Sequence, residues 1–263
     1  MYKNLRLFFK LAKINIINQM EYRFSFFFLV LGKLGRLLLT LLFFGVIYLN
    51  VDTIAGWSFF QVLMLFATYN LVDLLASMLF SRNLMWNFPN FIESGDLDKI
   101  LTKPINTQFF ISFYEFDVMD MTSLLPAFIL LGVAFFKLQI KITLLQASLF
   151  LLFMLAGLIF LYSIMLIVSS LAVWTTRLYG LTSLFDTIAK MARIPGDFYK
   201  GFVKFFLYYL LPVIIIATVP TQALFGLLDI RYAVFLLIFV FAFFILSSKF
   251  FKFALKHYTS VSN

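Results

Sequence analysis

Residues 142–174 read ITLLQASLFLLFMLAGLIFLYSIMLIVSSLAVW and contain no charged side chain. A helix of about 20 apolar residues is enough to cross the ~30 Å hydrocarbon core of a bilayer. This stretch is too long for one upright span and too short for two spans joined by a turn. We interpret it as one tilted helix that extends past the membrane on the cytoplasmic side. The stretch therefore predicts a membrane-embedded chain.

The composition extends this interpretation to the whole chain. Of 263 residues, 63% are hydrophobic and 13% are charged, whereas soluble proteins have about 25% charged residues. Five further apolar stretches give six predicted transmembrane helices, which are Phe24–Leu49, Phe59–Phe80, Phe109–Phe136, Ile142–Trp174, Lys204–Val219 and Tyr232–Ser248. We expect an all-α membrane protein with a single six-helix domain over residues 23–263, in which the residues after Pro220 form a short re-entrant piece.

Residues 1–22 predict an amphipathic helix that lies in the membrane interface before the first span. Lys3, Arg6, Lys10 and Lys13 repeat at helical spacing opposite an apolar face, a pattern typical of interfacial helices. The chain carries a net charge of +9, and Lys and Arg concentrate on the cytoplasmic side of membrane proteins. We expect both termini and the two long loops, 81–108 and 175–201, to face the cytoplasm, and we expect no nucleic-acid partner.

The chain lacks the residues of several enzyme classes. It has no cysteine, and its only histidine is His257, which excludes thiolate chemistry and most zinc and triad sites. The phosphate-binding pattern GxxxxGK[ST] is also absent from the sequence. We therefore predict no catalytic residue, no metal site and no cofactor in this chain, and we expect any ATP to be bound by another chain.

The first long loop contains a short predicted helix. Gly95 marks a turn, Asp96 follows in a position to cap a helix, and Pro104 ends it. The residues between them include Leu97, Ile100 and Leu101, which give the helix an apolar side. The pattern fits either a loop packed against the membrane face or a docking surface for a partner.

The same loop carries a family resemblance. The string GDLDKILTKP, Gly95–Pro104, is similar to the signature of the first cytoplasmic loop in type-2 ABC transporter permeases. The strings ARIPGDFYKG (Ala192–Gly201) and LPVIIIATVP (Leu211–Pro220) resemble the elements around the fifth span of that family. The chain most resembles the bacterial six-span branch, whose ATPase is encoded separately.

The resemblance implies an ABC exporter permease in the bacterial cytoplasmic membrane. The residues Gly95, Leu97, Asp98, Leu101 and Pro104 would then couple the permease to an ATPase subunit that binds ATP and Mg²⁺. A second permease subunit would complete the pathway, and this branch favours a paralogue over a second copy. Membrane lipid is the remaining expected partner.

The second long loop predicts an amphipathic helix between Arg177 and Arg193. Leu178, Leu181, Leu184, Phe185, Ile188 and Met191 share one face, while Asp186, Lys190 and Arg193 share the other. We expect this helix to lie along the inner interface. It would be either a passive surface helix or a second coupling element.

Six charged residues fall within the predicted spans, at one depth in the cytoplasmic half: Lys33, Arg36, Asp73, Glu115, Asp117 and Asp120. Each costs several kcal/mol unless it finds a partner, water or the interface. They would pair and hold the first three helices together, or the surplus acids would attract a cationic amphiphile. Alternatively, residues 109–120 form an interfacial helix and its acids are solvated.

Two other function classes compete with transport. A membrane-embedded enzyme acting on lipid would need a general base, and the dense candidates are Glu115, Asp117 and Asp120. A channel or scaffold subunit would need polar positions recurring along one face of a span, whereas the outer halves of these spans are almost wholly apolar. A co-purifying ATPase would support the transporter alone.

Overall fold

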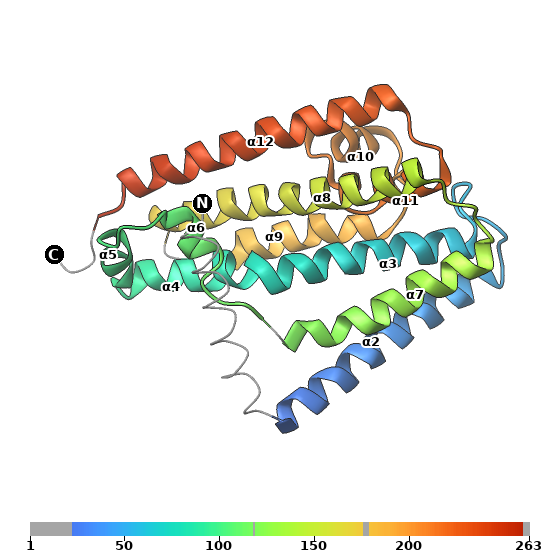
Figure 1. The fold of residues 1–263 in the computed structure, drawn as a ribbon, viewed down its shortest axis with the longest axis horizontal. Helices are drawn as coiled ribbons and strands as arrows, with labels where there is room; N and C mark the ends of the chain where they lie inside the picture. Colours follow the sequence, from blue (N-terminus) through green and yellow to red (C-terminus); the bar gives the residue numbers. More distant parts are fainter. Residues whose placement is uncertain (1–22, 118, 176–178, 260–263) are drawn as a thin grey trace.

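The computed structural model describes residues 23–117, 119–175 and 179–259 as helices and connecting segments, without a strand. Figure 1 shows an elongated bundle of roughly aligned helices. The predicted interfacial helix of residues 1–22 lies outside the described residues. The α-helices are α2 (Arg23–Tyr48), α3 (Phe59–Ala76), α4 (Phe88–Glu93), α5 (Asp96–Leu101), α6 (Thr107–Ser112), α7 (Leu124–Leu138), α8 (Leu144–Ser170), α9 (Tyr179–Lys190), α10 (Gly201–Phe205), α11 (Thr218–Phe225) and α12 (Ile230–Lys256).

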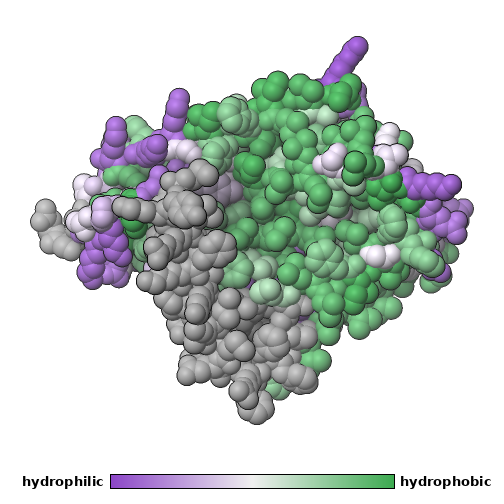
Figure 2. Space-filling model, in the orientation of Figure 1, coloured by the Kyte–Doolittle hydropathy of each residue, from purple (hydrophilic) through white to green (hydrophobic). Residues whose placement is uncertain are grey.

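The bundle has the surface of a membrane protein. On the face shown in Figure 2, the visible middle of the bundle is covered by apolar side chains, and hydrophilic side chains gather toward its two ends. Four helical stretches of the described chain are long and apolar enough to cross a bilayer: Leu31–Tyr48, Phe59–Ser81, Leu144–Val173 and Ile230–Lys256. The chain is thus a multi-pass membrane protein, and its described residues contain four such helices where six were predicted.

The two ends of the bundle are distinguished by the segments that meet there. At the α5 end, on the left of Figure 1, lie α5 and the last turns of α8 and α12, where the Trp174 ring lies 6.0 Å from the Phe250 ring. At the Trp57 end lie the loop between α2 and α3 and the first turns of α8 and α12. We use these two names below.

The uncharged stretch 142–174 forms the single long helix that was predicted. A capping box begins α8, since the Thr143 hydroxyl accepts from the Gln146 backbone N–H and the Gln146 side chain accepts from the Thr143 N–H. The helix packs on α3, α11 and α12 at the centre of the bundle. At Gly157 a Cβ would meet the Ile215 carbonyl oxygen at 2.9 Å, so glycine permits this close approach.

The predicted third span, Phe109–Phe136, is wrong as a single helix. It is interrupted after α6, and α7 begins only after a 3₁₀ turn at Met119–Ser123. The break is held by Asn83, which lies in a π-helical stretch (Asn83–Asn87) that prolongs α3. Its amide donates to the carbonyls of Ser112 (3.1 Å) and Glu115 (2.7 Å), and its oxygen accepts from the Glu115 N–H (3.0 Å). One buried side chain thereby satisfies the backbone that the missing helical turns leave unpaired.

The predicted fifth span, Lys204–Val219, is also wrong. Lys204 lies at the Trp57 end, where it pairs with Asp197, and the chain then turns inward until Ile215 touches the middle of α8. It returns through α11 to Gly226, whose Cβ position lies 2.9 Å from the Gln146 side chain. The buried residues from Val213 to Val219 make this a re-entrant element, and such irregular backbone is tolerated at membrane depth when protein surrounds it.

The segment 175–201 is not a loop confined to one face. It leaves α8 at Trp174 on the α5 end, and it reaches the other end at Asp197, whose carboxylate accepts from the Trp57 indole at 3.3 Å. Between these points α9 buries Phe185 and Ala189 in the core. An amphipathic helix therefore passes along the bundle where an interfacial helix was predicted.

Candidate functional site

The first candidate element is α5, the short helix of the predicted coupling segment. Gly95 precedes it with a left-handed backbone (φ 74°), a conformation that favours glycine, and Asp96 occupies its first turn rather than the capping position we predicted. The helix ends at Leu101, three residues before Pro104. It lies at the α5 end of the bundle, beside the last turn of α12 (Figure 1).

Two sides of α5 have different surroundings. Leu97 and Ile100 are buried in the main core cluster, which also holds Phe88 and Phe251. Leu101 is exposed, as is Lys99. Leu97, one of the residues predicted to dock a partner, therefore anchors the helix, and the outward surface consists of Asp96, Lys99 and Leu101.

The charged side chains on the outward side of α5 pair with each other. Lys99 donates to the Asp96 carboxylate at 2.7 Å, and this hydrogen bond, assisted by one from Ser94, lowers the pKa of Asp96. Asp98 points toward the C-terminal segment, since burial together with the nearby Asp98 carboxylate raises the pKa of Tyr258. A partner on this surface would meet a paired acid and base beside an exposed leucine.

The second candidate element is a polar cavity inside the bundle. Its volume is about 260 Å³, and it lies between α2, α3 and α7. The Lys33 ammonium lies 2.6 Å from an Asp120 carboxylate oxygen, and the Ser77 hydroxyl donates to the other oxygen of Asp120. This is the ion pair we predicted between the first and third predicted spans. The cavity is also lined by Asn70, Asp73 and Arg193.

Among the described side chains, the ion pairs of the predicted intramembrane charges fall into two groups. Glu115 and Asp117 lie in the break before α7 and face Arg82, at 3.5 and 3.4 Å. Arg82 belongs to the extension of α3, and its side chain is 54% exposed. These acids are therefore neither paired with Lys33 nor simply solvated. Arg36 lies in α2, and its side chain is outside the described part of the structure.

Arg193 is the functional candidate that the sequence analysis missed. Its guanidinium lies 4.9 Å from the centre of the Tyr69 ring on α3, and its Nε is buried without a hydrogen-bond partner. We had placed it on the solvated face of an interfacial helix. The periodic charges at Asp186, Lys190 and Arg193 were the available signal, but a helix beside a polar cavity shows the same periodicity.

Arg193 changes the charge balance of the polar cavity. Lys33 and Arg193 contribute two positive charges, and Asp73 and Asp120 contribute two negative ones. The surplus of acids on which a cationic substrate was predicted is thus absent from the described lining. The described lining therefore carries equal numbers of acidic and basic side chains.

Comparison with known proteins identifies the class of this chain. The model of the ABC-2 family transporter proteins matches residues 34–262, so the chain belongs to that family. Membership makes it a membrane-embedded transport subunit rather than an enzyme, and it implies association with an ABC ATPase subunit. Neither the curated proteins nor the solved structures yield a match. The loop signature at Gly95–Pro104 predicted this family correctly.

Proposed function

We propose that this chain is the permease subunit of an ABC exporter that moves a hydrophobic or amphipathic substrate. A separate subunit would bind ATP and Mg²⁺ and hydrolyse the ATP. The observation that supports this most is α5, a short helix at one end of an apolar bundle with one side anchored and the other exposed. Export and the bacterial cytoplasmic membrane are inferred from the family resemblance, and the cytoplasmic termini from the distribution of Lys and Arg.

The anchoring of α5 supports a mechanical role. Leu97 and Ile100 share a core cluster with Phe88 and Phe251. The rings of these two phenylalanines lie 5.5 Å apart and join α12 to α4, which follows the extension of α3 directly. Packed interiors move in concert because they leave little free volume. A displacement of α5 by a bound ATPase would therefore be passed to α3 and α12.

The test of coupling changes only the exposed side of α5. We expect the pair Asp96→Arg with Leu101→Arg to abolish co-purification of the ATPase subunit and its substrate-stimulated hydrolysis, while the permease stays folded. Lys141→Glu, an exposed change before α8 at the Trp57 end, is the matched control. Unchanged assembly and unchanged stimulated hydrolysis in the double variant would show that α5 does not couple.

Orientation is testable because the chain has no cysteine. We propose that the α5 end faces the cytoplasm. Single cysteines at Lys99 and at Lys141 place one thiol at each end of the bundle. In intact cells, a membrane-impermeant maleimide should label the cysteine at position 141 and spare the one at position 99. The reverse pattern would invert the proposed topology.

We further propose that the permease acts as a dimer, paired with a paralogous permease in preference to a second copy. The resemblance implies that a chain of this size supplies half of a pathway. Affinity purification through a tag on this chain, followed by intact-mass analysis of the complex, should show a second permease. A complex with one permease copy would refute the dimer, and two tagged copies would refute the paralogue.

A further inference from the structure

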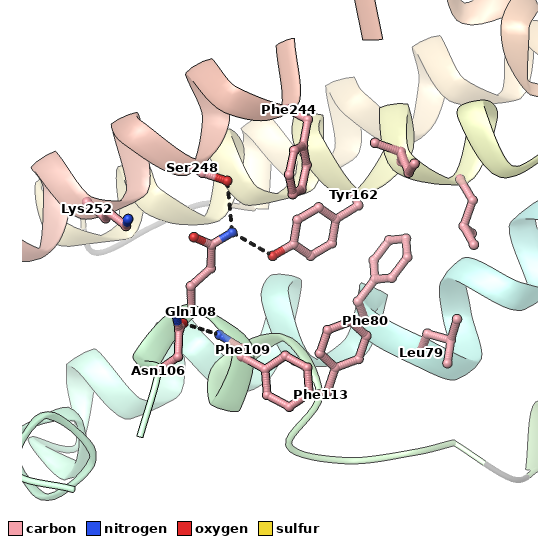
Figure 3. A pocket seen from close by; sticks show the side chains of 12 residues that line it. Leu79, Phe80, Asn106, Gln108, Phe109, Phe113, Tyr162, Phe244, Ser248 and Lys252 are labelled. Carbon is pink, nitrogen blue, oxygen red and sulfur yellow. Dashed lines mark hydrogen bonds between the residues drawn. The ribbon is translucent and has the colours of Figure 1, made fainter. Parts of the chain in front are cut away.

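A second cavity lies near the α5 end, between α6, the prolongation of α3, α8 and α12. We call it the apolar cavity; its volume is about 470 Å³, which is within the range of small-molecule sites. Figure 3 shows the side chains of α6, α8 and α12 converging on it. It shares no lining residue with the polar cavity.

One end of the apolar cavity is polar. The Gln108 amide donates to the Tyr162 hydroxyl (3.0 Å) and to the Ser248 hydroxyl (3.1 Å), which ties α6 to α8 and α12 (Figure 3). The Asn106 side-chain oxygen accepts from the Phe109 N–H at 3.0 Å, so its NH₂ group points elsewhere. Lys252 completes this end.

Lys252 gives the cavity its charge. It is the one charged side chain among the described lining residues, and no carboxylate lines the cavity with it. It takes part in none of the five ion pairs found within the described chain. An occupant that carries a negative charge would satisfy Lys252, whereas a cation would be repelled.

The other end of the cavity is apolar and open to the membrane. Phe80, Phe113 and Phe244 present rings to it (Figure 3), and Leu79 and Leu158 also line the cavity. Ile159, a further lining residue, is 42% exposed on the outside of the bundle. A hydrocarbon chain can enter from the bilayer at this wall, and a fully water-soluble anion would gain nothing from the three rings.

We propose that the apolar cavity binds an anionic membrane phospholipid, with its phosphate at Lys252 and Asn106 and one acyl chain among the three phenyl rings. The volume of about 470 Å³ is enough for the phosphate and part of one acyl chain, and the rest of the lipid would remain in the bilayer. Asn106 and Gln108 follow the coupling segment directly, so the lipid would fasten this segment to α12. This inference does not depend on ATP-driven transport.

The test measures lipid binding to the purified full-length chain in detergent. Mass spectrometry of the intact complex would count bound phosphatidylglycerol and phosphatidylcholine of identical acyl chains. We expect phosphatidylglycerol to bind about tenfold more tightly, which corresponds to about 1.4 kcal/mol, because the cationic choline of phosphatidylcholine offsets its phosphate and repels Lys252. Lys252→Gln should remove this preference. Lys249→Gln, an exposed change one turn earlier that does not line the cavity, should preserve it.

Two further arms separate the possible sources of the anion and test the acyl-chain end. Glycerol phosphate, which carries the anion without a chain, should fail to displace the lipid, and Ile159→Trp should block both lipids by filling the apolar end. Equal binding of the two lipids, an unaffected Lys252→Gln variant, or displacement by glycerol phosphate would each overturn the proposal. The melting temperature without lipid shows whether each variant folds. If Ile159→Trp does not fold, the lipid preference of the Lys252→Gln variant alone decides whether the proposal holds.

Discussion

The two cavities hold their charged groups in different ways. Among the described residues, two acids and two bases line the polar cavity between α2, α3 and α7, and its Lys33 and Asp120 side chains form an ion pair. Lys252 is the one charged residue in the described lining of the apolar cavity between α6, α8 and α12. A balanced set of charges stabilises helix packing, because each charge finds its partner in the protein. A lone charge at the membrane edge is instead available to a ligand.

The largest expected loss of stability is at Asn83, which lies between the helices that line the two cavities. Asn83 holds the break between α6, which lines the apolar cavity, and α7, which lines the polar one. Asn83→Leu should leave the carbonyls of Ser112 and Glu115 and the N–H of Glu115 unpaired, and cost about 3–4 kcal/mol because each buried unsatisfied group costs about 1–3 kcal/mol. Denaturant unfolding in detergent measures this.

Asn87→Ala serves as the matched control for that prediction. Asn87 lies one turn further along the same helical extension, and its amide makes one hydrogen bond, to the Asn83 oxygen (3.1 Å). We expect a loss of about 1 kcal/mol or less, the usual net contribution of one hydrogen bond. Equal losses in the two variants would show that the break does not depend on Asn83.

The next effect concerns the closed pair of the polar cavity. Asp120→Ala leaves Lys33 without this partner and should destabilise the bundle by about 2–3 kcal/mol; complete burial would cost about 3–5 kcal/mol, but these side chains are 30% and 23% exposed. The double variant Lys33→Asp with Asp120→Lys restores opposite charges and should recover most of the loss. Thermal unfolding of both variants checks this, and a double variant no better than Asp120→Ala would remove the pair as a stabilising contact.

A smaller effect compares two arginines. Arg193 stacks over Tyr69 at 4.9 Å with a buried Nε, whereas Arg82 is 54% exposed beside Glu115 and Asp117. Arg193→Gln should cost about 1–2 kcal/mol through its desolvated cation–π contact. Arg82→Gln should cost less than about 1 kcal/mol because exposed ion pairs contribute little. The two melting temperatures, measured in one detergent, give the ranking, and a larger loss at Arg82 would contradict it.

The smallest effect is outside both cavities, at the exposed Asp96–Lys99 pair of α5. Its hydrogen bond lowers the pKa of Asp96 in the folded protein. The stabilisation is therefore present above the unfolded pKa of about 3.9 and disappears as the pH falls through the lowered folded value. Asp96→Asn should remove this pH dependence and leave the melting temperature at pH 7 nearly unchanged. A large loss at pH 7 would mean that Asp96 has a structural contact beyond Lys99.

Local patterns predicted the elements that depend on neighbouring residues. The long helix α8, the turn at Gly95 and the short helix α5 follow from apolar runs, a glycine and a proline that lie close together in the chain. An ion pair such as Lys33–Asp120 could also be predicted, because opposite charges at one membrane depth need partners. Leu97 was assigned to a docking surface because a short amphipathic pattern does not tell which side is covered.

The path of residues 175–226 through the bundle could not be predicted from the sequence. Residues 204–219 are apolar enough to span, whereas residues 177–193 carry four charged side chains, so hydropathy assigned a span to the first segment and a surface helix to the second. In the structure the charged segment passes beside a polar cavity, and the apolar one re-enters against Gly157 of α8. Hydropathy averages over a window, whereas these placements depend on partners more than twenty residues away.

The sequence by itself determined that this chain is embedded in a membrane, that residues 142–174 form one long uncharged helix, and that the chain belongs to the ABC-2 transporters. These properties follow from composition, from runs of apolar residues and from one ten-residue motif. Only the tertiary structure decided where the helices break, which charged side chains pair, and which cavity is lined by a lysine without an acid among its described residues. Those outcomes depend on contacts such as Asn83 with Glu115 and Arg193 with Tyr69, which join segments that no local pattern relates.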